Sequence, residues 1–169
     1  HVGGHRAADP LVVIHGGNWD TGSRAAFVGQ FLERLTAAGY NWFSIDYRKN
    51  GYSPHAESVD DIRAAIEFIR CHAKEFRIDP GNIALLGEDT GATLALMTAA
   101  EKPEGIKAVI SIGGVYNVNQ LSVPASQVPT LIIHGANDRE VPPQQAGQYC
   151  EAQRAAGQRC EYFGVDGAI

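Results

Sequence analysis

The feature that most constrains the fold is a regular alternation of short apolar runs with longer segments of helical periodicity. Six short runs rich in β-branched residues recur along the chain, at 11–14, 42–45, 83–86, 109–112, 130–133 and 161–165. Between them, apolar side chains repeat with the spacing of one helix face or a buried helix, in segments 27–35, 62–76, 90–100 and 143–156. This alternation predicts right-handed crossovers and a mainly parallel sheet with helices on both faces.

Length and charge narrow the class of protein. The chain has 169 residues and a formal net charge of −5. That length suits one domain over residues 1–169 with a core of its own, and the acidic balance argues against a nucleic-acid partner or an anionic membrane surface. The sequence holds no apolar run of the ~18 residues that cross a bilayer. We therefore expect a soluble domain that acts on a small molecule; its oligomeric state and compartment stay open, with the cytoplasm weakly favoured.

The cysteines do not form a recognisable framework. Cys71, Cys150 and Cys160 are the three in the chain, and none belongs to a C-x-x-C pair. Because an odd number is not a disulfide framework, we expect all three to be small unpaired side chains. A bridge between Cys150 and Cys160, across the turn from the last helix to the last strand, is the minor alternative.

Three loops at the ends of predicted strands carry unusual residues, and ligands of open parallel sheets bind beyond the carboxyl ends of the strands. The first loop is His15-Gly-Gly-Asn-Trp19. Adjacent glycines let a backbone turn its N–H groups into a cavity, where they can stabilise an oxyanion. A plain glycine-rich turn fits this loop alone equally well.

The second loop, Gly87-Glu-Asp-Thr-Gly91, joins a predicted strand to a buried helix with the G-x-S-x-G spacing of a nucleophile elbow. Asp89 holds the central position, over a helix N-terminus that favours a carboxylate. A helix N-cap is the simpler role for such an aspartate. The third loop, from His134 to Pro142, carries Asp138 where a triad acid would orient a histidine, with a solvated turn residue as the alternative.

Taken together, the order and strand context of the three loops resemble the α/β-hydrolase superfamily. The resemblance is to its small esterase and lipase-like group with an H-G-G-x-W loop, which includes acetyl esterases, feruloyl esterases and kynurenine formamidases. Ser44-Ile-Asp-Tyr-Arg48 and the H-G-x-x-D-x-x-V-P pattern of residues 134–142 extend the match over nearly the whole chain. The resemblance implies an α/β-hydrolase fold with a minimal cap, no cofactor and no metal.

The resemblance also implies roles for individual residues. Asp89 falls on the nucleophile position and Asp138 on the triad acid, so we expect their carboxyl groups to face one cleft. The N–H groups of the oxyanion hole fall on Gly17, Asn18 and Thr90, and those of Asn18 and Thr90 should converge near Asp89. The expected substrate pocket also includes His15, Gly16, Trp19 and Glu88.

Two departures from the family bear on activity. Asp89 stands where the family has its serine. The family's catalytic histidine follows the last strand in a stretch like V-x-G-A-x-H, whereas this sequence reads Val165-Asp-Gly-Ala-Ile169. We expect the histidine to follow Ile169, just as we expect the first hairpin strands of the fold to precede His1.

These observations predict a hydrolase of the esterase type for small carboxylic esters, impaired or inactive because Asp89 replaces serine. A carboxylate that attacks an acyl carbon gives an anhydride, and its charge opposes the charge that develops at the oxyanion. One alternative is an enzyme of the haloalkane dehalogenase or epoxide hydrolase type, whose aspartate attacks an alkyl carbon. Another is a hydrolase homologue that binds a ligand without catalysis.

Overall fold

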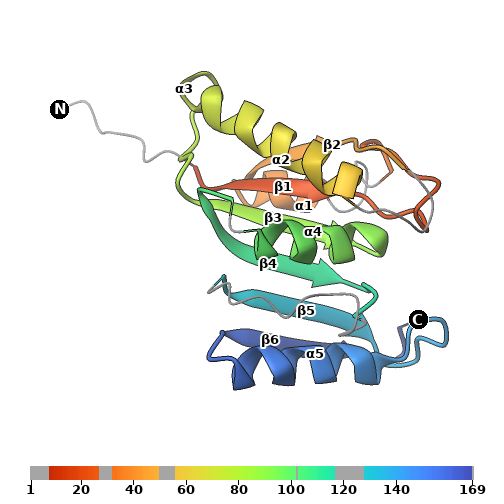
Figure 1. Ribbon diagram of the computed structural model, residues 1–169. Coiled ribbons are helices and arrows are strands. Elements are labelled where there is room, and N and C mark those ends of the chain that lie inside the picture. Colours follow the sequence, from red (N-terminus) through yellow and green to blue (C-terminus); the bar gives the residue numbers. More distant parts are fainter. Residues whose placement is uncertain (1–7, 27–31, 50–55, 102, 117–127, 169) are drawn as a thin grey trace.

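Within the residues that the structure describes, six parallel strands form one sheet in the order β2-β1-β3-β4-β5-β6 (Figure 1). The computed structural model describes residues 8–26, 32–49, 56–101, 103–116 and 128–168. The strands are β1 (Pro10–Ile14), β2 (Asn41–Ile45), β3 (Ile83–Glu88), β4 (Ile106–Ile112), β5 (Thr130–Gly135) and β6 (Cys160–Val165). Every apolar run singled out in the sequence lies in one of these strands, so the predicted parallel sheet is confirmed.

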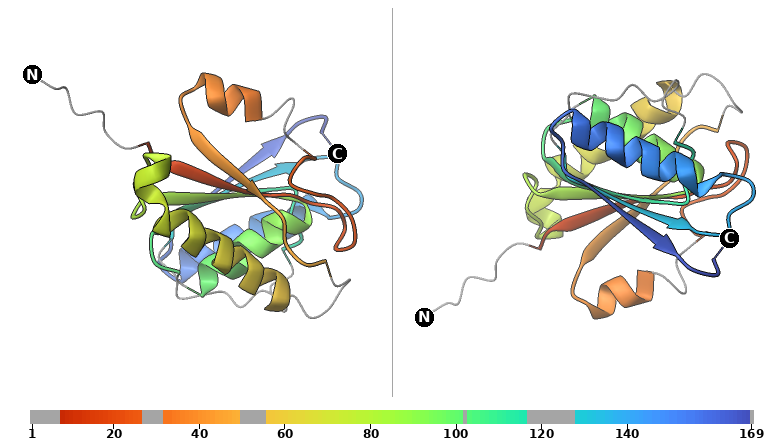
Figure 2. Two further views of the ribbon diagram at one scale, coloured as in Figure 1. Left: turned by 90° about the horizontal axis from the view of Figure 1, so that it is seen from above. Right: turned by 90° about the horizontal axis from the view of Figure 1, so that it is seen from below.

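The helices lie on both faces of this sheet. They are α1 (Leu32–Ala37), α2 (Ala56–Cys71), α3 (Ala73–Phe76), α4 (Thr90–Ala100) and α5 (Pro143–Ala155). Figure 2 shows α2, α4 and α5 on one face and α1 on the other. In the part of the chain that the structure describes, no helix is both long and apolar enough to cross a membrane.

One predicted helix has different bounds in the structure, and another lies partly outside the described residues. The helix expected over 62–76 begins earlier, at Ala56, and is interrupted at His72 before the short α3. Residues 27–31 of the helix expected over 27–35 lie outside the described residues, as does most of the connection, 117–127, on which the expectation of a minimal cap rests.

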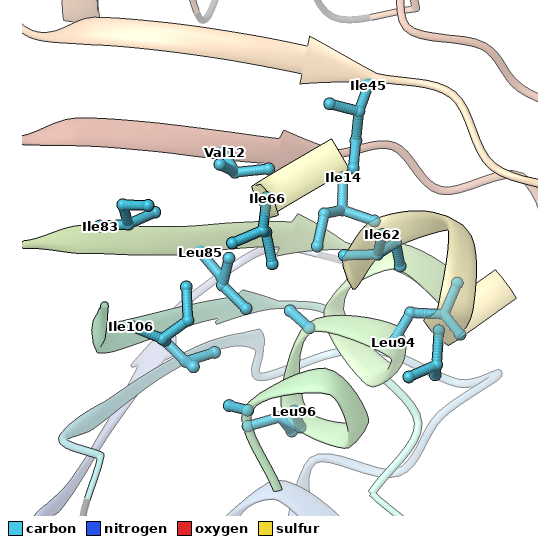
Figure 3. Close-up of a cluster of buried hydrophobic side chains, with 14 of the residues drawn as sticks. Val12, Ile14, Ile45, Ile62, Ile66, Ile83, Leu85, Leu94, Leu96 and Ile106 are labelled. Carbon is cyan, nitrogen blue, oxygen red and sulfur yellow. The ribbon is translucent and has the colours of Figure 1, made fainter. Parts of the chain in front are cut away.

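The core follows from the alternation of side chains along the strands. In β1, Val12 and Ile14 belong to the larger apolar cluster, whereas Leu11 and Val13 belong to a second cluster that includes Leu32 of α1. Figure 3 shows part of the larger cluster, where side chains of α2 and α4 pack on the central strands. All five residues of β1 are buried, because helices cover both faces of the sheet, and this explains the unbroken apolar run in the sequence.

The helix that follows the second loop is the most deeply buried one. Of the 11 residues of α4, nine are buried, so its apolar sequence leaves no clear solvent face. It contacts β3, β4, β1 and α2. This packing fixes the start of α4 firmly against the carboxyl ends of the central strands.

The expectation of three unpaired cysteines is wrong for two of them. Cys150 of α5 and Cys160 of β6 form a disulfide, with their Cα atoms 5.4 Å apart, while Cys71 is free and exposed. Both bridged residues are buried. The bridge thus joins α5 to β6, the strand at the edge of the sheet.

Reduction of the Cys150–Cys160 bridge should lower the free energy of unfolding. The two residues are separated by 10 positions, and closing a loop of that size in the unfolded chain is worth about 2–3 kcal/mol. Denaturant unfolding with and without a reductant measures the difference. In Cys71→Ala, which keeps the bridge, stability should stay within about 0.5 kcal/mol of the parent. Equal stability of the oxidised and reduced protein would contradict this prediction.

Candidate active site

The turn between β3 and α4 is strained at Asp89. Its φ of 51° and ψ of −122° lie in a region that typically costs a residue with a side chain about 1–3 kcal/mol. The neighbouring glycines are tightly packed: a Cβ at Gly87 would overlap the carbonyl of Gly91, and a Cβ at Gly91 would overlap the carbonyl of Ile14. The sharp turn expected at this position is therefore present, and close packing on both sides holds it.

The Asp89 carboxylate binds the loop that follows β1. Its Oδ2 accepts hydrogen bonds from the backbone N–H groups of Gly17 at 2.9 Å and Asn18 at 3.0 Å. Thr90 Oγ1 donates a third, at 3.1 Å. Asp89 occupies the N-cap position of α4, but its side chain makes no capping hydrogen bond to that helix. The residues predicted for an oxyanion hole all contact the carboxylate of their own chain.

These hydrogen bonds decide the ionisation of Asp89. Burial acts to raise the pKa of its carboxyl, but backbone hydrogen bonds from Gly17, Asn18 and Thr90, with the Thr90 hydroxyl, lower it and prevail. The pKa therefore lies below the ordinary value of 3.8. Asp89 is a carboxylate at neutral pH, and a permanent negative charge lies among the donors predicted to receive a transient one.

The pKa of Glu88, the last residue of β3, is shifted in the opposite direction. Burial raises the pKa of its carboxyl above the ordinary 4.5, and the charge of Asp89 adds to this effect, while a backbone hydrogen bond from Gly16 opposes it. Gly16 is so close that a Cβ there would overlap Glu88 Oε2. Glu88 and Asp89 are thus adjacent carboxyl groups whose environments push their ionisation apart.

A cavity of about 470 Å³ opens beside this turn, near the ends of β3, β4 and β5. Asp89 and Asp138 both line it, as the sequence predicts for two carboxyl groups of one cleft. The full lining is Glu88, Asp89, Gly113, Asp138, Arg139, Glu140 and Val141. With more acidic than basic side chains, this lining is strongly negative.

A second cavity, of about 590 Å³, lies elsewhere, between α2 and the loop before β4. Arg63 and Arg70 line it and form ion pairs with Glu101 and Glu104 at 3.0 and 2.9 Å. It lies near the amino end of β4, away from the strand ends at which ligands of such sheets bind. The smaller cavity beside Asp89 is therefore the candidate site.

Asp138 is held through both oxygens of its carboxylate. Oδ1 accepts the N–H groups of Glu140 and Val141, each at 2.9 Å, and Oδ2 lies 3.1 Å from Nε2 of the buried His134. With 17% of its side chain exposed, Asp138 is not a solvated turn residue. Sequence reasoning missed the contact with His134, although the four-residue spacing in H-G-x-x-D was a signal for it.

The predicted pocket residues divide into two groups. Glu88 lines the cavity, whereas His15, Gly16 and Trp19 do not. His15 is 1% exposed and stacks on Tyr47 with ring centroids 4.5 Å apart, and Trp19 packs against the main core cluster. These positions do not support a pocket role for the three. The loop turns its backbone toward Asp89 and its large side chains inward.

In the described part of the chain, no histidine lines the cavity. His15 and His134 are buried, and His72 follows α2, where its Nδ1 lies 2.8 Å from the carbonyl of Phe68. The histidines outside the described residues are His1, His5 and His55. The described residues also contain no group of three or more His, Cys, Asp or Glu side chains placed to hold a metal ion.

Comparison with known proteins identifies the family. The BD-FAE family model matches residues 4–121, well over half of the chain. The chain belongs to the BD-FAE family. Esterase LipC of Mycobacterium tuberculosis (strain ATCC 25618 / H37Rv) is 29% identical to this BD-FAE chain, over 96% of the chain and 53% of LipC. The kynurenine formamidase of Meyerozyma guilliermondii is 30% identical, over 66% of the chain and 45% of that enzyme.

Solved structures give the same result for the BD-FAE chain. Thermogutta terrifontis esterase 2 phosphonylated by cyclosarin superposes with a TM-score of 0.78 at 26% identity, covering 99% of this chain and 75% of that one. Its butyrate-bound form gives a TM-score of 0.77 at 25% identity, with 99% and 76% covered. The fold is that of the esterase-like α/β-hydrolases, and the chain resembles carboxylic ester hydrolases. It spans about half the length of the curated relatives it matches.

Replacing Glu88 with glutamine should stabilise the fold at neutral pH. The raised pKa of Glu88 means that the folded state binds its proton more tightly than the unfolded state does. The stabilisation that protonated Glu88 gives to the folded state is therefore fully present below pH 4.5, and it is lost as the pH rises through the pKa that Glu88 has in the folded state. Glu88→Gln should raise the free energy of unfolding at pH 7 and change it little below pH 4, as measured by urea unfolding across pH.

The matched control for this change is Glu151→Gln, at an exposed position on α5, which should alter stability little at either pH. A Glu88→Gln variant that is destabilised at pH 7, or stabilised equally at both pH values, would show that burial and the charge of Asp89 impose no penalty on ionised Glu88.

Proposed function

We propose that this BD-FAE chain carries an ester-hydrolase site whose oxyanion hole, formed by the N–H groups of Gly17, Asn18 and Thr90, is closed by the carboxylate of Asp89. The observation that carries the proposal is the pair of hydrogen bonds from Gly17 and Asn18 to Asp89 Oδ2. A substrate carbonyl oxygen needs such donors as it becomes an oxyanion. While Asp89 holds them, ester hydrolysis is impaired.

The substrate class that fits this site is small carboxylic esters. Esterases are among the relatives, and a structural neighbour, Thermogutta terrifontis esterase 2, has been solved with butyrate bound. Short acyl groups are therefore the chemistry we carry over to this chain. Asp138, held by its hydrogen bonds to Glu140 and Val141, takes the position of the triad acid. A triad acid orients a histidine, so the partner of Asp138 would be an imidazole that lies between Asp138 and Asp89.

Two physical effects make Asp89 a poor replacement for serine. Attack of its carboxylate on an acyl carbon would give an anhydride in place of an ester, and its charge repels the negative charge that develops on the carbonyl oxygen. Loss of the nucleophile in another triad hydrolase lowers turnover by about 10⁶-fold. We therefore expect binding of an acyl ligand to be lost together with ester hydrolysis, because both need the same N–H groups.

Opening the oxyanion hole should create a carboxylate site. In Asp89→Ala, the N–H groups of Gly17 and Asn18 lose their internal partner and become available to butyrate. We expect butyrate to bind this variant at least about tenfold more tightly than the unchanged protein. Chemical-shift perturbation of the Gly17 and Asn18 amide resonances in a butyrate titration measures both the affinity and the location.

Glu140→Gln is the matched control, because it removes a negative charge from the cavity lining and leaves Asp89 in place. If it binds butyrate as well as Asp89→Ala does, relief of charge explains the gain and the closed oxyanion hole does not. Equally tight binding by the unchanged protein, or its rapid turnover of p-nitrophenyl acetate, would contradict the proposal.

An aspartate nucleophile is the second candidate, and one observation favours it. The bonds from Gly17, Asn18 and the Thr90 hydroxyl all reach Oδ2, so this set of donors leaves Oδ1 for attack. On a haloalkane, Oδ1 would form a bond to the alkyl carbon while the carbon–halogen bond breaks and halide leaves with the electron pair. Intact-protein mass after incubation with 1-bromobutane distinguishes the two candidates, since a butyl ester on Asp89 would displace the first.

A further inference from the structure

We propose that His15 and Thr21 are positioning residues that lock the two peptide groups of the oxyanion hole, His15 through the carbonyl of Gly16 and Thr21 through the carbonyl of Gly17. This inference rests on the proposed function, because it assumes that the N–H groups of Gly17 and Asn18 form the hole. It goes beyond that proposal by assigning a positioning role to two side chains that do not line the cavity.

Peptide geometry links each carbonyl to the N–H that matters. In a trans peptide, the C=O of one residue and the N–H of the next lie in one plane and point in opposite directions. Fixing the Gly16 carbonyl therefore fixes the Gly17 N–H, and fixing the Gly17 carbonyl fixes the Asn18 N–H. Both N–H groups point at Asp89 Oδ2, at 2.9 and 3.0 Å, so both peptide planes need support from behind.

His15 supplies that support for the first peptide. Its Nδ1 lies 2.7 Å from the Gly16 carbonyl, and because a carbonyl only accepts, Nδ1 carries the proton. The ring has little freedom: it is 1% exposed, its plane lies 18° from that of Tyr47, and the Tyr47 hydroxyl donates to the His15 carbonyl at 2.7 Å. The His15 donor is thus held at a fixed place behind the Gly16 peptide.

Gly22 closes over this hydrogen bond. A Cβ there would overlap the Gly16 carbonyl and come within 2.6 Å of His15 Nδ1. Its φ of 82° is also one that favours glycine. The chain can therefore pass directly over the bond between His15 and Gly16 and exclude other partners from it.

Thr21 supplies the support for the second peptide. Its hydroxyl and its N–H both donate to the Gly17 carbonyl, at 2.8 and 2.9 Å, and the N–H of Asp20 approaches the same oxygen at 3.2 Å. Gly17 itself has a φ of 133°, which is rare for residues with a Cβ. The donors gathered on its carbonyl keep the Gly17–Asn18 peptide in this orientation.

The carboxylate of Asp89 reports on both locks without any turnover. Its pKa is lowered by the hydrogen bonds from Gly17 and Asn18 in particular, so rotation of either peptide away from Asp89 makes the acid weaker. A ¹³C NMR titration that follows Asp89 Cγ, with Glu88 followed separately at Cδ, measures this effect in the folded protein.

His15→Leu keeps the volume of the buried ring and removes the donor, whereas His15→Asn keeps an N–H near the position of Nδ1. Thr21→Val removes the hydroxyl, and Thr21→Ser keeps it. We expect His15→Leu and Thr21→Val to lower the acid dissociation constant of Asp89 about three- to tenfold, and His15→Asn and Thr21→Ser to restore much of it. Hydrogen exchange of the Gly17 and Asn18 amides should be faster in the first pair.

Thr36→Val is the matched control, because Thr36 Oγ1 makes the same kind of bond to the carbonyl four residues earlier, at 3.1 Å. Thr36 belongs to α1, which lies on the face of the sheet opposite α4 (Figure 2). Thr36→Val should leave the dissociation constant of Asp89 unchanged. If the pKa of Asp89 is lowered in the unchanged protein and stays as low in both His15→Leu and Thr21→Val, the positioning role of His15 and Thr21 is overturned. That result would leave the proposed oxyanion hole standing. Should His15→Leu fail to fold, His15→Asn and the exposed Thr21 pair still test the positioning role. An ordinary pKa for Asp89 in the unchanged protein contradicts the proposed oxyanion hole as well.

Discussion

The structure of the site depends on one interaction, the hydrogen bonding of Asp89 Oδ2 by the backbone of Gly17 and Asn18. These residues are about 70 positions apart along the chain, and they meet because β1 and β3 are neighbours in the sheet. The interaction joins the loop after one strand to the strained turn after the other. It also fixes a negative charge among the N–H groups that we propose as the oxyanion hole.

Both partners of this interaction are supported from behind. On the Asp89 side, the buried helix α4 and the close contact of Gly91 with the Ile14 carbonyl hold the turn. On the loop side, His15 and Thr21 contact the carbonyl oxygens whose peptide groups point their N–H toward Asp89. The donors are therefore in place before any ligand arrives, and such preorganisation is what makes a hole of this kind effective.

Local sequence patterns were enough to predict the strands, the buried helix and the sharp turn at Asp89, because each depends on residues close together in the chain. For the His15 loop, the family resemblance predicted backbone N–H groups near Asp89, but the sequence did not predict that the His15 and Trp19 side chains lie outside the cavity lining. Whether side chains or backbone face the site depends on positive φ angles at Gly17 and Asn18, which tertiary contacts impose. The pairing of Cys150 with Cys160 was only the minor alternative for a similar reason, since it depends on how α5 packs beside β6.

The most direct test of the central claim is to detect the hydrogen bonds to Asp89 themselves. NMR can measure scalar coupling across hydrogen bonds between the amide nitrogens of Gly17 and Asn18 and the carboxyl carbon of Asp89. Such coupling arises only where a hydrogen bond exists and not between groups that are merely close. We expect a correlation from each amide to Asp89 Cγ at neutral pH. Absence of both correlations, in a spectrum that shows the bond from the Asp89 N–H to the Ile112 carbonyl, would contradict the central claim.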